Sequence, residues 1–187
     1  MKSNVIMVVM SGVIVLASGC SKDATKPPRV SSKHDLAVEA ESTHKAINVG
    51  SHYWKVERES GPPHLLAFPS DNTVFDRKRI TGDSPGVEYQ VTFEQPGTYY
   101  LWVKGKGEAG GASVIPGLDG KLLAENADFM GFFPSEFSWI GALHDTGKRA
   151  ALQIDTAGEH LVSFWMLEDG FRFDKFMITA DSNRVPE

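Results

Sequence analysis

The chain of 187 residues has very little cysteine: Cys20 is the single one, which excludes an intrachain disulfide and a zinc site made of cysteines. It also lacks an excess of positive charge, because 19 lysines and arginines stand against 24 aspartates and glutamates, a formal net charge of −5. A protein that binds nucleic acid needs a basic field to displace counterions from phosphates, so we expect no nucleic-acid partner. The sequence also lacks a nucleophile elbow, a phosphate loop and a Cys–His pair, so no motif marks a catalytic residue.

The N-terminus carries an apolar run from Val5 to Ala17, shorter than the about 20 residues that a membrane-spanning helix needs. With Lys2 in front of it, such a run is typical of a signal peptide. Small residues lead directly into Cys20, which resembles the lipobox of bacterial lipoproteins. The alternative is an ordinary signal peptide with an incidental cysteine.

The lipobox resemblance implies that residues 1–19 are removed and that Cys20 is lipidated, which anchors the protein in a membrane. Ser21, in place of aspartate, implies sorting to the bacterial outer membrane. Residues 20–35 contain two prolines and no apolar period, so we interpret them as a flexible tether. The folded domain is then expected at 36–180, followed by a tail at 181–187.

Alternating apolar and polar residues predict β-strands in this domain. From Val87 to Phe93 every second residue is apolar, so one face of the strand is buried and the other meets water. A turn signal, Gln95-Pro96-Gly97, joins it to a second strand at 98–104. Further strands are expected at 38–42, 150–154, 159–167 and 171–179. No long segment has the 3.6-residue period of a helix, so we predict an all-β domain, a β-sandwich or jelly roll.

Several motifs along residues 36–180 resemble carbohydrate-binding modules of families 6 and 35. These motifs are Val38-Glu39-Ala40-Glu41, the stretch from Gly97 to Val103, Gly117-Leu118-Asp119-Gly120, Ala157-Gly158-Glu159-His160 and the stretch from Glu168 to Lys175. The last is especially similar to the C-terminal module of glycoside hydrolase family 115 proteins. The resemblance implies a galactose-binding-like jelly roll.

Two glutamates of the first expected strand, Glu39 and Glu41, are two residues apart and therefore share one face. Like charges on one face repel unless a cation lies between them. The resemblance implies a structural calcium ion held by these two residues and by Asp174 of the last strand, stapling the two strands together. The alternative is a solvated edge strand with salt bridges.

Aromatic side chains supply the candidate ligand-binding residues. The period-two pattern places Trp102 and Trp165 opposite the apolar faces of their strands, where an indole ring would stack on a sugar. Tyr53, Trp54 and Trp139 lie in loop-like or strand-edge contexts, where the resemblance implies a ligand cleft. The alternative for each tryptophan is a place in the core. Phe129, Phe132 and Phe133 make one loop unusually apolar, either as a hydrophobic plug or as a binding surface.

The function expected from these features is the non-catalytic binding of a polysaccharide or other glycan by a membrane-anchored module. A second interpretation is an envelope adaptor whose jelly roll binds another protein. A third is an enzyme that acts on polysaccharide. An exposed groove lined by tryptophans favours a sugar ligand, and a flat apolar patch favours a protein partner.

Overall fold

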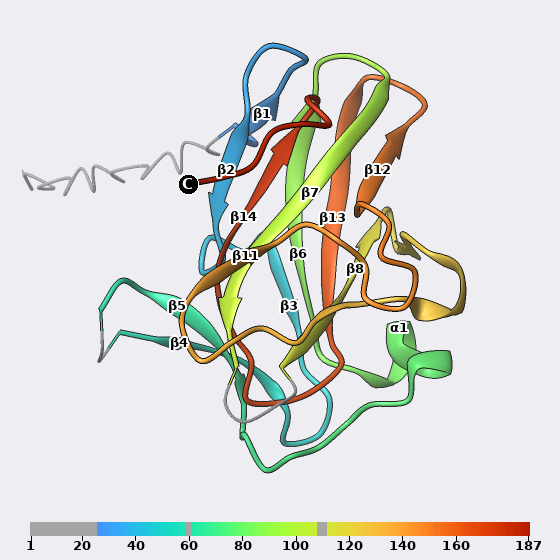
Figure 1. Ribbon diagram of the computed structural model, residues 1–187. Helices are drawn as coiled ribbons and strands as arrows, with labels where there is room; N and C mark the ends of the chain where they lie inside the picture. The colour runs from blue at the N-terminus through green and yellow to red at the C-terminus, as the bar shows by residue number, and fades with distance from the viewer. Residues whose placement is uncertain (1–25, 59–60, 108–111) are drawn as a thin grey trace, which may run out of the picture.

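The computed structural model describes residues 26–58, 61–107 and 112–187, and in these ranges the chain forms a sandwich of two β-sheets (Figure 1). Cys20 and the expected signal peptide lie outside the described residues. The prediction of an all-β sandwich is confirmed. No helix among the described residues is long and apolar enough to cross a membrane.

The first sheet runs in the order β1-β6-β13-β8-β10, with β3 also paired to β6 and β9 to β8. Its strands are β1 (Arg29–Val30), β3 (Lys45–Ile47), β6 (Gly86–Phe93), β8 (Ser113–Leu118), β9 (Lys121–Leu122), β10 (Met130–Gly131) and β13 (Gly158–Met166).

The second sheet runs in the order β11-β7-β14-β5-β4, with β12 also paired to β7 and β2 to β14. Its strands are β2 (Leu36–Glu39), β4 (Tyr53–Glu57), β5 (His64–Phe68), β7 (Gly97–Lys106), β11 (Ser138–Ile140), β12 (Ala151–Ile154) and β14 (Arg172–Thr179). The described residues also contain three short helical segments: η1 (Arg77–Arg79), α1 (Ile80–Asp83) and η2 (Glu125–Ala127).

The core lies between the sheets and is rich in aromatic rings. The alternation along β6 buries Tyr89, whose ring centroid is 4.8 Å from that of Phe176 on β14 of the opposite sheet. Phe164 on β13 meets Phe173 on β14 at 4.9 Å. Burying such a side chain stabilises a fold by about 1.5–3 kcal/mol, so these cross-sheet contacts hold the two layers together.

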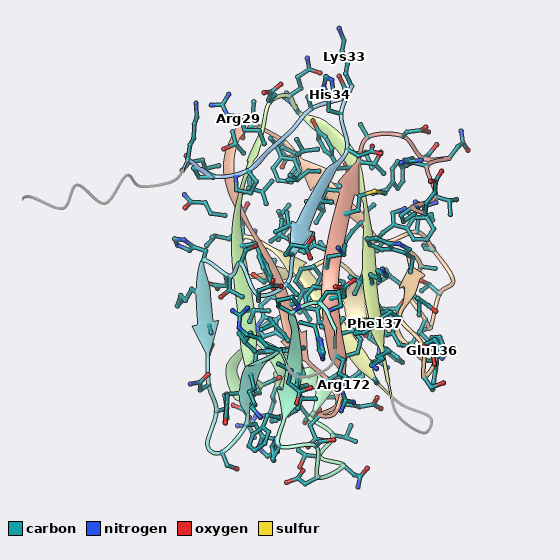
Figure 2. All side chains as sticks on the ribbon, turned by 90° about the vertical axis from the view of Figure 1, so that its left-hand side faces the viewer. Arg29, Lys33, His34, Glu136, Phe137 and Arg172 are labelled. Atoms are coloured by element: carbon teal, nitrogen blue, oxygen red, sulfur yellow. The ribbon has the colours of Figure 1, made fainter. Side chains whose placement is uncertain are left out.

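The domain begins earlier along the chain than the expected boundary at residue 36. β1 pairs in parallel with β6, and the Val30 side chain is fully buried in the core. The turn that carries Lys33 and His34 lies at one end of the sandwich, and Phe137 and Arg172 lie in the other half (Figure 2). Residues 29–35 therefore belong to the fold, because Val30 gains burial and β1 covers the edge of β6.

The C-terminal residues 181–187, expected as a tail, also contact the domain. Arg184 Nε donates a hydrogen bond to Asp35 Oδ2 at 2.7 Å, and Arg149 donates one to the carbonyl oxygen of Ser182 at 3.1 Å. Both contacts lie near the second sheet, so this segment adds cover to the outer side of that sheet.

Candidate functional site

A hollow of about 830 Å³ opens where η1 and η2 lie beside the end of β13, next to α1 in Figure 1. Its apolar lining is Val74, Phe75, Leu122, Ala127, Phe129 and Leu167, and its polar lining is Asp76, Arg77, Lys78, Asn126 and Glu168. This volume is in the range of small-molecule sites, and an apolar wall with a few convergent polar groups is the lining that such sites share.

The segment that carries Phe75 and Arg77 is pinned to the strand beneath the hollow. The backbone N–H of Phe75 donates to the carbonyl oxygen of Leu167 at 2.9 Å, and Val74 forms a bridge with Glu168. The Asp76 side chain then accepts a hydrogen bond from the backbone N–H of Lys78 and so caps η1. The cap and the bridge fix the direction in which η1 leaves the sheet.

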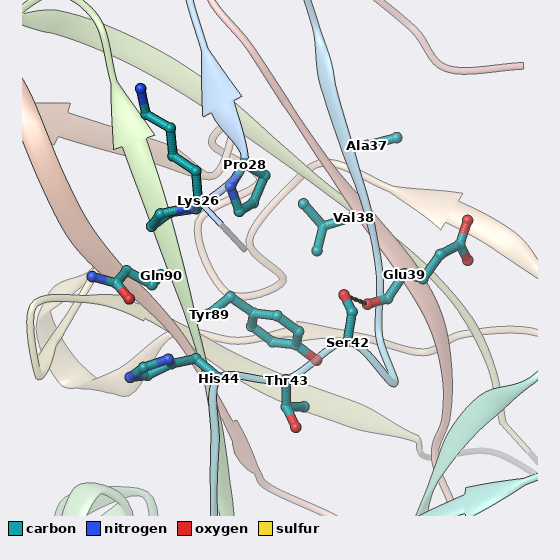
Figure 3. Close-up of a pocket in the computed structure, with 11 residues that line it drawn as sticks. Lys26, Pro28, Ala37, Val38, Glu39, Ser42, Thr43, His44, Tyr89 and Gln90 are labelled. Atoms are coloured by element: carbon teal, nitrogen blue, oxygen red, sulfur yellow. Dashed lines mark hydrogen bonds between the residues drawn. The ribbon is translucent and has the colours of Figure 1, made fainter. Parts of the chain in front are cut away.

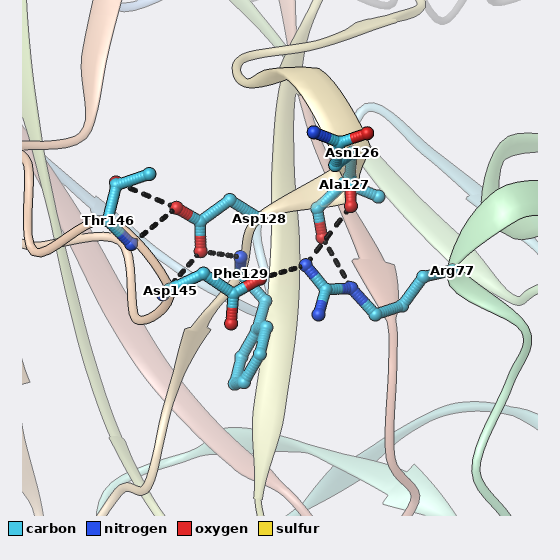
Figure 4. Close-up of polar contacts among 7 residues, drawn as sticks. All are labelled: Arg77, Asn126, Ala127, Asp128, Phe129, Asp145 and Thr146. Carbon is cyan, nitrogen blue, oxygen red and sulfur yellow. Dashed lines mark hydrogen bonds and ion pairs between the residues drawn. The ribbon is translucent and has the colours of Figure 1, made fainter.

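Arg77 joins three segments that are far apart in the sequence (Figure 4). Its Nε donates to the carbonyl oxygen of Ala127 at 2.9 Å, and its Nη2 donates to that of Asn126 at 3.1 Å. The same Nη2 contacts the Asp145 carboxylate. The guanidinium carbon lies 5.1 Å from the ring centroid of Phe129, close enough for a cation–π contact.

Asp128 holds the loop of Phe129 in place from the other side (Figure 4). Its buried carboxylate accepts four hydrogen bonds, from the backbone N–H groups of Phe129, Asp145 and Thr146 and from the Thr146 hydroxyl. Burial raises the pKa of this carboxyl, but the hydrogen bonds to its ionised form outweigh burial and hold the pKa below its ordinary value. An ionised, fully bonded carboxylate therefore frames this edge of the hollow.

Beside the hollow, Phe129, Phe132 and His144 form a cluster of rings. Their centroids are 6.1 Å apart for the two phenylalanines, 4.9 Å for Phe129 and His144, and 4.4 Å for Phe132 and His144. Phe132 is 56% exposed and has a φ of +58°, a left-handed backbone conformation that is strained for a bulky residue. A strained backbone that presents an apolar ring to solvent points to a binding role.

The neighbouring Phe133 has the opposite role. Its side chain is buried, and its ring centroid lies 4.6 Å from that of Phe171 in the core. Phe133 is therefore a hydrophobic plug. Phe132 is exposed, and its use as a binding surface stays a prediction.

Glu168 supplies a half-buried carboxyl to the hollow. Burial raises the pKa of this carboxyl, and the charge of Asp169 raises it further, while a hydrogen bond from Ser113 Oγ at 2.9 Å lowers it. With Arg77 and Lys78 as donors and Glu168 as an acceptor, the lining offers both kinds of hydrogen-bond partner. An apolar wall, exposed rings and mixed polar groups suit a ligand that has both C–H faces and hydroxyl groups.

Two of the predicted ligand-binding tryptophans belong to the core, so the prediction that they stack on a ligand is wrong. Trp54 is 6% exposed and packs edge-on against Phe171 and Phe173. Trp165 is 4% exposed, although the alternation along its strand placed it on the wet face. That face is covered by Ile80 of α1, which packs with Trp165 in a small second core.

Trp102 and Trp139 lie on the outer face of the second sheet, away from the hollow. The Trp102 ring lies 4.5 Å from the Arg149 guanidinium carbon and packs so closely on Gly141 that a Cβ there would be 2.6 Å from it. Trp139 pairs with Lys104, whose Nζ is 6.0 Å from its ring centroid, and its Nε1 donates to the carbonyl oxygen of Glu187. Both rings are thus partly covered by the chain itself.

Tyr53, the remaining predicted residue, lies on the β4–β5 hairpin. Its ring is tilted against that of Phe68, with the centroids 5.0 Å apart. The five aromatic residues singled out in the sequence therefore do not gather into one site. Arg77 and Asp128, which help to build the hollow, carry no local sequence signal of their own, and Glu168 appeared only as the first residue of a family-like motif.

Two of the three acids expected to hold calcium, Glu39 and Asp174, contact lysine side chains. Lys175 Nζ is 2.9 Å from Glu39 Oε1 and 3.9 Å from Asp174 Oδ2, and Lys104 Nζ is 3.4 Å from the same Asp174 oxygen. The hydrogen bond to Glu39, together with the nearby acids, raises the pKa of Lys175. These contacts fit the expected alternative, an edge strand with salt bridges, because ammonium groups lie where a divalent cation would bind.

One atom of this region keeps the calcium prediction open. Glu41 Oε2 is buried and has no hydrogen-bond partner among the described residues. Glu39 also borders a second hollow of about 560 Å³ between β2 and β6, where Figure 3 shows it next to Ser42 with its carboxylate pointing away from Tyr89. The Ser42 hydroxyl donates to the Glu39 carbonyl oxygen at 2.6 Å, so the turn after β2 is closed by its own side chain.

Comparisons with known proteins agree with this fold. No family model matches the chain. An uncharacterised protein of Formosa agariphila is 35% identical over 81% of this chain, which spans only 45% of that protein's length. The C-terminal family 6 carbohydrate-binding module of LamC, a marine laminarinase from Zobellia galactanivorans, is 12% identical, with 78% of this chain and 99% of that one covered and a TM-score of 0.51.

Two family 35 modules give similar values. A β-1,4-mannanase from Podospora anserina that joins a family 26 hydrolase to a family 35 module is 12% identical, with 81% of this chain and 29% of that one covered, at a TM-score of 0.53. The family 35 module from Paenibacillus barcinonensis is 12% identical, with 78% and 99% covered, at 0.50. The chain has the fold of these modules. The predicted jelly roll is thereby confirmed as the fold of the chain.

Proposed function

We propose that the domain is a non-catalytic glycan-binding module and that it binds a polysaccharide in the hollow between η1, η2 and the end of β13. The observation that carries this proposal is the exposed ring of Phe132, on a backbone with positive φ, beside a hollow that contains both apolar and polar side chains. The solved structures of similar fold, which are carbohydrate-binding modules, support the same class of ligand.

The chemistry of the hollow suits a sugar ring. The C–H groups on one face of a pyranose pack against an aromatic ring such as Phe132. The hydroxyl groups at its edge then find a donor in Lys78 and an acceptor in Glu168. Because a single stacking contact contributes about 1 kcal/mol beyond the burial of its apolar area, two or three such contacts give an affinity in the micromolar-to-millimolar range.

The polar groups of the hollow are assigned to binding rather than to a reaction. Glu168 accepts a hydrogen bond from Ser113, and Arg77 is held by two backbone carbonyl groups and by Asp145. Side chains held in this way are suited to orienting a bound ligand.

The module is further proposed to be tethered to the bacterial outer membrane through a lipid on Cys20. The support is the apolar run that ends at the single cysteine of the chain. Mass spectrometry of the mature N-terminus tests this part separately. An N-terminal residue other than a lipidated cysteine would overturn the anchor and leave the glycan proposal intact.

The glycan proposal is tested by gel electrophoresis through polysaccharide-containing gels, preceded by a glycan array that identifies the polysaccharide. Phe132→Ala removes an exposed ring, so the variant is expected to fold and to bind about tenfold more weakly. Phe137→Ala is the matched control, because it removes a ring of the same size that contacts Lys106 on the second sheet. Equal retardation of both variants would contradict the assignment to the hollow.

An array without any bound polysaccharide would favour the other interpretation, an adaptor that binds a protein. The same exposed Phe132 favours that alternative, since an apolar ring at the surface also suits insertion into a partner.

A further inference from the structure

Three side chains near the hollow meet outside the glycan site. His52 precedes β4, Asp71 lies in the loop after β5, and Asp169 lies in the turn between β13 and β14. Each offers one ligand atom, and these atoms all lie within 4.8 Å of one another. Within the described ranges this is the cluster of histidine and acidic side chains that comes close enough to hold a metal ion.

Two atoms of this cluster lack the partners that buried polar groups require. Asp169 is only 8% exposed, and its Oδ2 accepts a hydrogen bond from the backbone N–H of Asp71 at 2.5 Å, but its Oδ1 has no hydrogen-bond partner. His52 Nε2 is also buried without a hydrogen bond, and it lies 3.6 Å from Asp71 Oδ1. Buried polar atoms are nearly always satisfied, so an unpartnered oxygen and an unpartnered nitrogen in one cluster need an explanation.

The surroundings hold the three donors in place. The Thr73 hydroxyl donates to Asp71 Oδ1 at 2.6 Å, and the backbone N–H of Asp169 donates to the Thr73 carbonyl oxygen at 3.1 Å. The His52 ring packs edge-on against Phe75, with the centroids 5.3 Å apart. Donors fixed in this way lose little conformational freedom when an ion binds.

We infer that His52, Asp71 and Asp169 form a binding site for a divalent transition-metal ion of the zinc class. A cation between them would bind the Asp169 oxygen that has no partner and the His52 nitrogen that makes no hydrogen bond and lies 3.6 Å from Asp71. It would also compensate the negative charges of the two carboxylates, which lie within 4.8 Å of each other.

The donor set selects the class of metal. Calcium and magnesium take oxygen ligands, whereas zinc accepts imidazole nitrogen at about 2.0–2.1 Å and carboxylate oxygen at about 2.0–2.2 Å. One imidazole and two carboxylates therefore favour zinc over calcium. Three protein ligands leave the fourth position of a tetrahedral ion open to water.

The site would tie together three segments, two of which border the hollow. Asp169 directly follows Glu168 in the sequence, and the His52 ring packs against that of Phe75. Both Glu168 and Phe75 line the hollow. The metal site is nonetheless independent of the glycan proposal, since its test measures the metal alone.

The test titrates zinc chloride into chelator-treated protein by calorimetry and follows the melting temperature. A Cys20→Ser background removes the only thiol as a competing ligand. We expect one zinc ion per chain and a melting temperature raised by about 5–10 °C at a hundredfold excess over Kd. His52→Gln and Asp169→Asn should both abolish the shift, because each removes a ligand and leaves the size of the side chain nearly unchanged.

Asp119→Asn is the matched control. It weakens a second close histidine–aspartate pair among the described residues, in which His160 Nδ1 lies 2.7 Å from Asp119 Oδ2, and it should leave zinc binding unchanged. Cobalt added to the unsubstituted cluster provides a readout that does not depend on any variant folding: its visible absorption should show a coordination number lower than that of the hydrated ion.

Each of several results would overturn the inference: no bound zinc, a cobalt spectrum equal to that of the hydrated ion, zinc binding that survives in both His52→Gln and Asp169→Asn, or stabilisation by calcium without stabilisation by zinc.

Discussion

Two regions of this domain combine aromatic rings with positive charge, and they use them differently. In the hollow, Arg77 lies over Phe129 but Phe132 remains 56% exposed. On the outer face of the second sheet, Arg149 covers Trp102 and the C-terminal residue Glu187 bonds to Trp139. The number of rings is similar, so what distinguishes a binding surface from a structural one is whether the chain itself already covers the rings.

The cations of the outer face are also engaged. Lys104 contacts both Trp139 and Asp174, and Lys175 contacts Glu39. A cation–π contact at an exposed site contributes about 0.5–1 kcal/mol, and an exposed ion pair contributes up to about 1 kcal/mol. These contacts join β2, β7, β11 and β14 to one another, so we assign the outer face to stability, in contrast to the hollow that is proposed to bind glycan.

The largest expected effect comes from removing the floor of the hollow. Trp165 packs with Ile80, Ala127 and Leu167 directly beneath the lining residues. Trp165→Ala should lower the free energy of unfolding by about 3–5 kcal/mol and abolish glycan binding. Trp139→Ala, on the outer face, should cost about 1 kcal/mol or less. Urea unfolding measures both, and equal costs for the two variants would remove the distinction between the regions.

Next in size is the effect of Asp128, the carboxylate that frames the hollow. Its folded pKa lies below the unfolded value, so the stability it contributes is present above about pH 4 and is lost as the pH falls through the lowered folded pKa. Asp128→Asn should therefore cost about 1.5–3 kcal/mol at pH 7 and less near pH 3.

The control for Asp128 is Asp155→Asn, an exposed aspartate in the turn before β13, which should have little effect at either pH. Urea titrations at the two pH values provide the measurement. A cost of Asp128→Asn that does not change with pH would show that the lost contacts, and not the charge, account for it.

A binding comparison of the two regions has a smaller expected effect. Trp139→Ala should leave glycan affinity within about twofold of the original, whereas Phe129→Ala should weaken it by about tenfold. Affinity electrophoresis on the polysaccharide found in the array measures both. The opposite ranking would move the glycan site to the outer face, where the sequence placed Trp139 and Trp102.

The sequence predicted the strands well wherever alternation was regular. The pattern from Val87 to Phe93 became β6, and the expected strands at 159–167 and 171–179 became β13 and β14. It missed β5 and β8, which are nearly continuously buried and so have no alternation, and β8 also contains Pro116. Periodicity reports which face a residue takes, and a strand buried on both faces gives no such signal.

The same limit explains why the sequence did not predict most residues of the hollow. Alternation correctly placed Trp165 opposite Phe164 and Met166, but nothing local shows that Ile80 covers that face. Arg77 reaches Asp145 from 68 positions away in the sequence, and such a contact exists only once the two sheets have packed. The run of phenylalanines before Trp139 was the one local signal that pointed to the hollow.

The smallest expected effect concerns Glu39, Glu41 and Asp174 on the outer face. It decides whether lysine side chains or a calcium ion neutralise these acids. Because the Lys175 ammonium already bonds to Glu39, we expect calcium to change the melting temperature of the protein by less than about 1 °C. Lys175→Met removes the positive charge that pairs with Glu39. Glu39 then lies near Glu41 and Asp174 without this counter-ion. Calcium should then stabilise the variant by a few degrees through mass action.

Scanning calorimetry with calcium and with chelator measures this difference, and Lys33→Met, which changes an exposed lysine in the turn after β1, is the control. A large calcium shift in the unsubstituted protein would mean that calcium displaces the lysine and that Glu41 Oε2, the acid oxygen left without a partner, is a ligand. A metal ion would then hold the acids of the outer face, and the lysines of that face would be free to bind an acidic ligand. The engagement of these lysines is the main reason for placing ligand binding only at the hollow, and that reason would no longer apply.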